Sequence, residues 1–167
     1  VEHMNPVGLM TVGDRSLHHT PALSRGTILQ WLHQLRRYHF TEGTTLGRRV
    51  RELIPRVEHR CLFIVISDLH DPDAVPAIKL MAQDHDCAVL HLEDPAERGG
   101  LKAGILRGVE AESGKEFVAG GRTRFILGED ARSLARAGVD YLKLPTDEPI
   151  LAKLRHFLKN RNSRRNA

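Results

Sequence analysis

The sequence lacks any apolar run approaching the roughly 20 residues that a membrane-spanning helix needs. It also does not open with the basic, apolar and small-residue regions of a signal peptide. These two absences exclude a membrane span within this chain and a recognisable secretory leader. We therefore expect a cytoplasmic protein.

Cysteine is scarce, and no residues are spaced for a zinc site. The two cysteines, Cys61 and Cys87, stand at the starts of apolar runs, so we expect buried, reduced thiols. The ten histidines are scattered, and no pair has zinc spacing on a common helix face. A zinc-dependent function is therefore not predicted.

Glycine-rich loops that cradle phosphate are absent as well. Gly99-Gly100 and Gly120-Gly121 lack both the spacing and the strand-to-helix context of such loops. No nucleophile elbow is present either. The sequence thus gives no sign of a nucleotide-binding loop or of an esterase-type nucleophile.

The positive charge is confined to one end of the chain. The formal charge of the whole is +4, but the last fifteen positions hold six basic residues and no acidic one, which leaves −2 on the rest. A body of this charge is not a nucleic-acid-binding surface, and we expect no nucleic-acid partner. The six residues are Lys153, Arg155, Lys159, Arg161, Arg164 and Arg165.

The chain is organised around the stretch Cys61–Asp71. Its apolar run, Leu62–Ile66, is short and rich in β-branched residues, which predicts a strand buried on both faces. Ser67 and Asp68 follow directly. In open α/β sheets, ligand sites lie at the carboxyl ends of the strands, so Asp68 is the first candidate for a functional residue.

The order of the predicted elements favours an α/β class. Strands alternate with amphipathic helices through the second half, which predicts a three-layer domain with a mainly parallel sheet covered on both faces. We expect one domain over residues 1–159 and a basic tail over 160–167. The expected strands are 7–12, 16–21, 62–66, 87–92 and 139–144, with a hairpin over 105–110 and 116–119. The second of these strands is expected to be a short edge strand, since Pro21 would be tolerated at its end. The expected helices begin near Ser24, Leu46, Asp73, Glu129 and Ile150, with Ser24 and Asp73 as caps of their helices and Gly138 as the C′ residue of the fourth. The first helix is expected to bury one apolar face, formed by Ile28, Trp31, Leu32, Leu35 and Tyr38.

Oxygen-bearing side chains cluster at element ends. Asp68 follows a strand, and Thr44 and Thr45 open a helix, so these side chains offer the hard ligands that Mg²⁺ prefers. Asp94 and Glu97 follow the next strand. The residues alone leave an alternative open, in which the threonines are N-cap residues and Asp68 is a turn residue.

An ordered set of motifs resembles one family. The set comprises Val7-Gly-Leu-Met-Thr-Val12, Gly43-Thr44-Thr45-Leu46, the Leu62–Ile66 strand with Ser67-Asp68, Asp94-Pro95-Ala96-Glu97, Glu112-Ser113-Gly114 and Pro145-Thr146-Asp147. It resembles the bacterial von Willebrand factor A-like family catalogued as domain of unknown function fifty-eight, which is associated with MoxR-type AAA+ ATPases. The similarity runs from about Val7 to Arg165.

The resemblance implies a Rossmann-like von Willebrand A fold with a metal-ion-dependent adhesion site. In such a site the ion mediates a protein–protein contact, and no reaction is catalysed. Thr44 matches the threonine ligand of the family, and Asp68 matches its later aspartate ligand. Thr45, Ser67, Asp71, Asp94 and Glu97 are supporting or alternative residues.

One departure from the family pattern concerns the first strand. In the family this strand ends in Asp-x-Ser-x-Ser, which supplies three ligands, and the motif is absent here; Asp14-Arg15-Ser16 imitates only its beginning. We expect an N-terminally truncated domain, either a fragment or a natural short form. Because the first strand is central in a doubly wound sheet, its neighbours would pair directly or leave edges open to dimerisation.

Two functions are therefore predicted. The first is a non-enzymatic interaction module, working with a MoxR-type AAA+ ATPase or its client in complex assembly or maturation, with Mg²⁺ at an incomplete site. The alternative is a Mg²⁺-dependent enzyme centred on Asp68, for phosphoryl transfer or hydrolysis, in which Asp94 or Glu97 is a further ligand or the general base.

Overall fold

The computed structural model describes residues 5–14, 17–37, 43–95, 105–109, 116–120 and 127–165. Its strands are β1 (Val7–Met10), β2 (His18–Ala22), β3 (Leu62–Ser67), β4 (Asp86–Glu93), β5 (Ile105–Val109), β6 (Glu116–Gly120) and β7 (Asp140–Pro145). Its helices are α1 (Arg25–Leu35), α2 (Leu46–Leu53), α3 (Ala74–Asp84), α4 (Leu127–Arg136) and α5 (Ile150–Arg165), with a short 3₁₀ turn over Ile54–Arg56. Within these residues no helix combines the length and the apolar composition that crossing a membrane requires.

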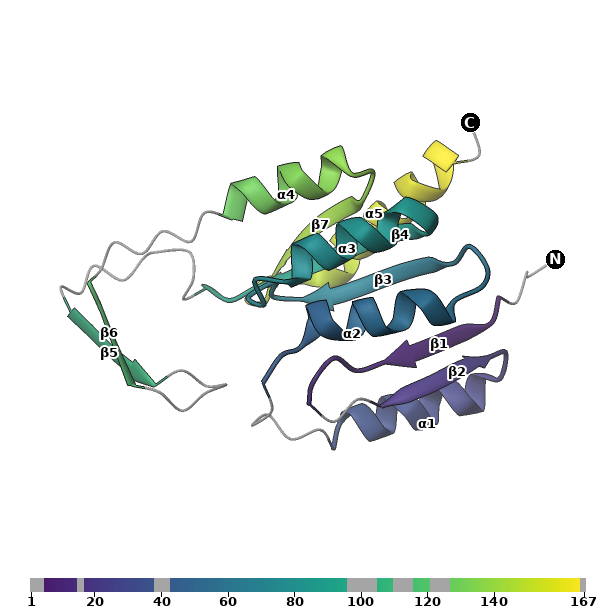
Figure 1. Ribbon diagram of the computed structural model, residues 1–167, viewed down its shortest axis with the longest axis horizontal. Helices are drawn as coiled ribbons and strands as arrows, with labels where there is room; N and C mark the ends of the chain where they lie inside the picture. Colours follow the sequence, from purple (N-terminus) through teal and green to yellow (C-terminus); the bar gives the residue numbers. More distant parts are fainter. Residues whose placement is uncertain are drawn as a thin grey trace.

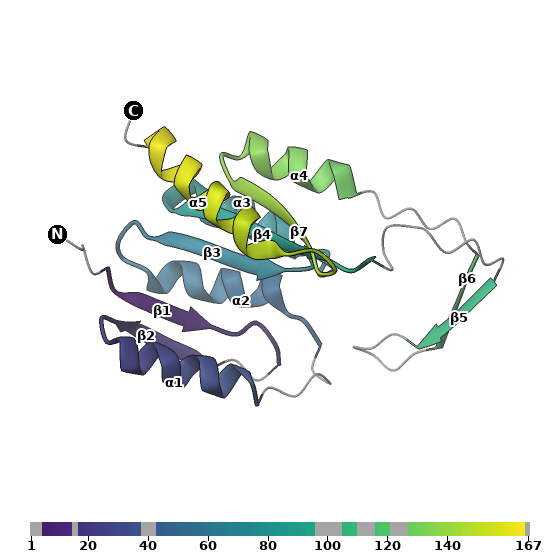
Figure 2. The same ribbon diagram turned by 180° about the vertical axis from the view of Figure 1, so that it is seen from behind.

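A parallel sheet in the order β3-β4-β7 forms the centre of the molecule. β4 lies between the other two strands, paired from Leu62↔Asp86 to Ser67↔His91 on one side and from Ala88↔Asp140 to Glu93↔Pro145 on the other. Helices α3 and α4 cover one face, and α5 covers β4 and β7 on the opposite face (Figure 1, Figure 2). The predicted α/β class with a parallel sheet and helices on both faces is confirmed.

Strands β1 and β2 form a second, antiparallel sheet with α1 beside it. The second strand of this pair was expected as a short edge strand, and it pairs from Val7↔Ala22 to Met10↔His18. Ser24 caps α1 as predicted, since its side chain accepts a hydrogen bond from the Thr27 amide at 3.4 Å. Trp31 is buried and stacks on His19, but Leu32 is exposed, so only part of the expected apolar face of α1 is core.

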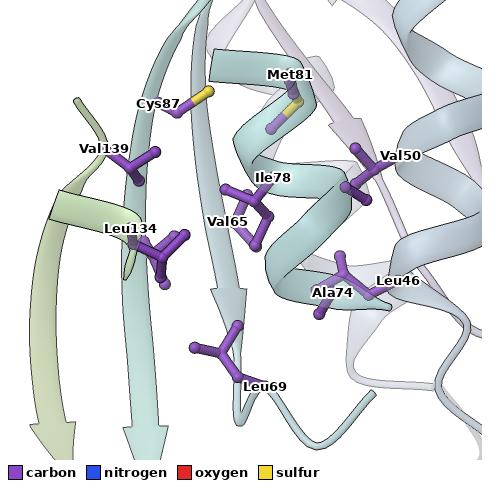
Figure 3. Packing of buried hydrophobic residues seen from close by; sticks show 12 residues of the cluster. Leu46, Val50, Val65, Leu69, Ala74, Ile78, Met81, Cys87, Leu134 and Val139 are labelled. Carbon is purple, nitrogen blue, oxygen red and sulfur yellow. The ribbon is translucent and has the colours of Figure 1, made fainter. Parts of the chain in front are cut away.

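The hydrophobic core lies between β3, β4 and helices α2, α3 and α4 (Figure 3). Apolar residues at three- and four-residue steps put Leu46 and Val50 of α2 against Ile78 and Met81 of α3. Leu134 of α4 closes the other end of the cluster. The chain leaves α4 through Gly138, whose φ of +76° matches the predicted C′ position.

The two faces of β3 differ, which corrects one prediction. Phe63 and Val65 pack on the core, but the alternate residues point to the face opposite α3 and are exposed: Leu62 by 48%, Ile64 by 47% and Ile66 by 60%. β3 was expected to be buried on both faces. That prediction is wrong for one face because none of the helices in the described part of the chain covers it.

Two further expectations change. Cys61 is exposed rather than buried, because it lies just before β3, whereas Cys87 on the central strand is buried as expected. Helix α5 continues to Arg165, into the expected basic tail. Arg161 is buried; its Nε donates to Asp140 Oδ2 at 2.8 Å, and its guanidinium also pairs with Asp86. Arg161 is thus part of the domain.

The hairpin expected over 105–110 and 116–119 is present as the antiparallel pair β5 and β6. In both views it lies apart from the central sheet (Figure 1, Figure 2).

Candidate functional site

The chain turns sharply at the carboxyl end of β3, where the first candidate residue lies. Ser67 Oγ accepts a hydrogen bond from the Leu69 amide at 3.0 Å, and Asp68 Oδ1 accepts one from the His70 amide at 3.2 Å. Leu69 has a φ of +60°, a left-handed conformation that costs a non-glycine residue on the order of 1 kcal/mol, and its buried side chain offsets this cost. The turn is therefore held by its own side chains.

The Asp68 side chain is 41% exposed at this turn. Its Oδ2 lies 3.6 Å from His70 Nδ1, so a protonated His70 would pair with it. Asp68 thus keeps a carboxylate at the solvent edge of the sheet while helping to form the turn. Both readings of Asp68, turn residue and ligand, are compatible with this geometry.

Asp71 has a structural role. Its Oδ2 accepts from the Gly47 amide at 2.8 Å, and its Oδ1 accepts from the Asp73 amide at 2.9 Å. It therefore satisfies amides at the starts of α2 and α3 together. Asp73, expected as the cap of its helix, occupies the N-cap position without a side-chain cap.

Thr44 and Thr45 lie at the start of α2, which the Asp71–Gly47 hydrogen bond holds against the turn after β3. Thr44 bridges Gly13, and the Thr45 amide donates to the Val12 carbonyl at 2.8 Å. The Thr45 hydroxyl donates to the same carbonyl at 3.0 Å. The Thr45 hydroxyl therefore links the segment after β1 to the start of α2. It does not cap the helix, so the N-cap alternative is wrong for Thr45.

The remaining sequence candidates are less well placed. Asp94 is exposed just beyond β4, and Glu97 lies outside the described residues. Across the parts of the chain that the structure describes, no three His, Cys, Asp or Glu side chains gather as a metal-binding group. Asp68 and Thr44 supply oxygen donors of the kind that Mg²⁺ prefers, but two protein ligands do not make a complete site.

A polar cluster that the sequence reasoning missed lies on the α3 and α4 face of β4 and β7. His91 is 1% exposed, and its Nδ1 is hydrogen bonded to the Tyr141 hydroxyl. Buried Glu93 pairs with Lys143 on the neighbouring strand. The signal was available in the sequence, because His91 and Glu93 alternate with apolar residues in a buried strand.

Burial dominates the electrostatics of this cluster. It lowers the pKa of His91, and Lys143 lowers that pKa further against the opposing effects of Asp68 and Glu93. Burial also raises the pKa of Tyr141 to about 12, with Asp130 and Glu93 acting in the same direction. At neutral pH the pair is therefore a neutral imidazole with a neutral phenol, beside an ion pair.

Comparisons with known proteins are sparse. No protein-family model matches the chain, and no curated protein matches it. Among solved structures, the chain is similar to one described as an uncharacterized membrane spanning protein from Vibrio fischeri, with 15% identity over 93% of this chain and 75% of that one, at a TM-score of 0.28.

Proposed function

We propose that the chain is a non-enzymatic protein–protein interaction module of the von Willebrand factor A-like type. The observation that carries the proposal is a half-exposed carboxylate, Asp68, in a turn at the carboxyl end of the parallel sheet. The Asp71–Gly47 hydrogen bond holds this turn against the helix start that bears Thr44. An edge of this kind is where open α/β sheets bind their ligands.

Mg²⁺ is the proposed mediator of the contact. Asp68 and Thr44 would contribute two oxygen ligands, and a partner carboxylate would contribute a third. The bound ion would supply a positive charge that recruits the acidic group of the partner.

The proposed partner is a MoxR-type AAA+ ATPase or its client, and the proposed role is assembly or maturation of another complex in the cytoplasm. This part rests on the family resemblance. It is tested by co-purification of the chain with such an ATPase from the same organism in millimolar Mg²⁺. Loss of the complex in EDTA and in Asp68→Ala is the expected result.

Thermal unfolding tests the metal site directly. We expect Mg²⁺ to raise the melting temperature, and we expect this rise to disappear in Asp68→Ala while stability in EDTA changes little. Asp84→Ala, which removes an exposed carboxylate at the far end of α3, is the matched control and should keep the rise. An Asp68→Ala variant that is equally destabilised with and without Mg²⁺ would make Asp68 a structural residue.

The second candidate is a Mg²⁺-dependent hydrolase or phosphoryl transferase centred on Asp68. The observation that favours it is the buried His91–Tyr141 and Glu93–Lys143 cluster, since perturbed acid–base groups of this kind are common in active sites. Hydrolysis of p-nitrophenyl phosphate, lost in both Asp68→Ala and His91→Gln, would support this function. Without such activity the interaction module is preferred.

A further inference from the structure

Helix α1 carries more apolar surface than its own sheet covers. Trp31 is buried against β2, and Ile28 and Leu35 are half-buried on the same side of the helix. Leu29 and Leu32, by contrast, are 65% and 52% exposed. In both views α1 lies beyond β2 as seen from the central sheet (Figure 1, Figure 2). The two leucines therefore lie on the outer surface of the molecule.

The exposed leucines belong to a row along one side of α1. Four exposed residues follow one another at steps of four, three and four, which places them on one face of the helix, and we call them the α1 stripe: Arg25, Leu29, Leu32 and Arg36. Arg36, the C-cap residue, keeps the helical conformation. Among the described residues, neither arginine of the stripe has an ion-pair partner. The stripe is thus apolar at its centre and cationic at both ends.

The segment around α1 is cationic throughout. Residues 15–41 contain four arginines, four histidines and no aspartate or glutamate, so their formal charge is +4 with histidine neutral. The positive charge is therefore not confined to the C-terminal end, because the net charge of the rest of the chain conceals this stretch. An anionic surface is attracted to α1, and the segment has no acidic residue that would repel it.

This combination argues against two other occupants of the stripe. In a two-fold contact between copies of the chain, the leucines would meet at the centre, and Arg25 would lie against Arg36 of the second copy, with no acidic residue of the segment to separate the charges. Nucleic acid would attract the arginines, but phosphate contacts leave the two exposed leucines without a role.

An anionic lipid bilayer suits both parts of the stripe. Helices that lie in a membrane interface bury leucines at the boundary between headgroups and acyl chains. Arginine stems extend along apolar surface while the guanidinium stays in water beside the phosphates. The cytoplasmic leaflet carries the negative surface charge that basic segments require, which agrees with the proposed cytoplasmic location.

We propose that α1 docks the protein on the surface of an anionic membrane. Leu29 and Leu32 insert among the lipid headgroups, Arg25 and Arg36 bind lipid phosphates at the two ends, and the helix axis lies parallel to the bilayer. The contact is peripheral and needs no membrane-spanning segment. This inference goes beyond the proposed function and does not depend on the Mg²⁺ site.

Sedimentation with lipid vesicles tests the proposal in EDTA, so that its failure is distinct from failure of the Mg²⁺ site. We expect the 167-residue chain to pellet with vesicles containing phosphatidylglycerol, to stay in solution with pure phosphatidylcholine, and to bind less as salt rises. Leu29→Ser/Leu32→Ser should lower the partition coefficient on the order of tenfold. Arg25→Gln/Arg36→Gln should lower it by a similar factor at low salt. All four positions are exposed, so the far-ultraviolet circular dichroism of both variants should match that of the wild type.

The basic helix α5 provides the matched control. Arg155→Gln/Lys159→Gln removes two exposed basic side chains outside the stripe and should leave binding unchanged, as should Leu80→Ser on α3. Loss of binding in the α5 variant together with full binding in the stripe variants would assign the membrane contact to α5 and overturn the proposal.

Tryptophan fluorescence locates the contact independently. Trp31, the single tryptophan, lies on the inner side of α1, one helix diameter from the proposed bilayer surface, so brominated phosphatidylglycerol should quench it in the bound protein. Binding without quenching would mean that another surface touches the membrane.

An acidic protein is the remaining alternative occupant. A synthetic helical peptide with leucines at its centre and glutamates at both ends serves as the probe. If the chain binds this peptide through the stripe but does not pellet with phosphatidylglycerol vesicles even at low salt, the stripe is a protein-docking surface and the proposal is wrong.

Discussion

At the scale of single residues, the two cysteines share a chemistry but differ in environment. Cys61 is exposed, whereas burial of Cys87 raises the pKa of its thiol to about 11, against a smaller lowering by Arg161. Since the thiolate is the reactive form, we expect a disulfide reagent at pH 8 to modify one thiol in the native protein and both in denaturant. Cys61→Ser should leave none reactive in the native state; rapid modification of that variant would contradict the burial of Cys87.

The raised pKa of Cys87 also makes the stability of the protein depend on pH. Because folding raises the pKa of Cys87, the folded state favours the protonated thiol. The stabilisation of the folded state by the protonated thiol is complete below the ordinary pKa of 9.0, and it is lost as the pH rises through about 11. Replacement of Cys87 by alanine should therefore flatten the fall in stability over that alkaline range, beyond its direct packing cost.

Asp71 carries the clearest structural prediction for a site residue. Asp71→Ala removes the acceptor of the Gly47 and Asp73 amides, so we expect a loss of about 1–3 kcal/mol in the free energy of unfolding by urea. Asp71→Asn keeps one carbonyl acceptor, so its free energy of unfolding should lie between those of Asp71→Ala and the wild type. Stability unchanged in Asp71→Ala would show that neither hydrogen bond contributes.

At the scale of elements, α2 and α3 approach closely at Gly47. A Cβ at this position would lie 2.4 Å from Asp73 Cβ and 2.7 Å from the Asp73 backbone, and backbone cannot move aside cheaply. We expect Gly47→Ala to cost about 1–3 kcal/mol despite the higher helix propensity of alanine, as overpacking does. Gly43→Ala, with nothing within 4 Å of its Cβ, is the matched control and should change stability little.

Local signals in the sequence predicted most elements, because capping and periodicity are properties of the segment itself. Ser24 capping α1, Gly138 ending α4 and the parallel central strands all follow from such signals. The exposure of Ile64 could not be predicted, since it depends on which segment packs against β3, and a strand's own residues do not record that. Asp68 was found because a carboxylate after an apolar strand is visible locally.

The rest of the candidate site required the register of the sheet. His91 meets Tyr141, and Glu93 meets Lys143, only because β4 and β7 are parallel in a particular alignment. The hydrogen bond between Asp71 and the Gly47 amide likewise joins residues 24 positions apart. Sequence patterns therefore identified residues of suitable chemistry, while their partners came from tertiary pairing.

At the scale of the whole molecule, two parts of the described chain are joined through polar contacts and through the packing of Val12 against the core. The β1-β2-α1 part meets the central sheet through α2, where Thr45 donates to Val12 and Arg49 Nη2 donates to the Asp14 carbonyl at 2.7 Å. No backbone ladder joins the two sheets in the described residues. Within the central part, ion pairs of Arg161 link α5 to the amino ends of β4 and β7.

This division predicts two unfolding transitions in urea. Trp31, the single tryptophan, is buried beside His19 in the β1-β2-α1 part, so its fluorescence reports that part alone, whereas far-ultraviolet circular dichroism reports mainly the helices of the central part. We expect the fluorescence transition at a lower urea concentration.

Arg161→Ala removes the buried guanidinium that pairs with Asp86 and Asp140. It should lower the urea midpoint of the dichroism transition only, because the central part loses about 3–5 kcal/mol in its free energy of unfolding. Arg155→Ala, at an exposed position on the same helix, is the control. Coincident transitions in every variant would show one cooperative unit, and would mean that the contacts of Thr45 and Arg49 suffice to couple the sheets.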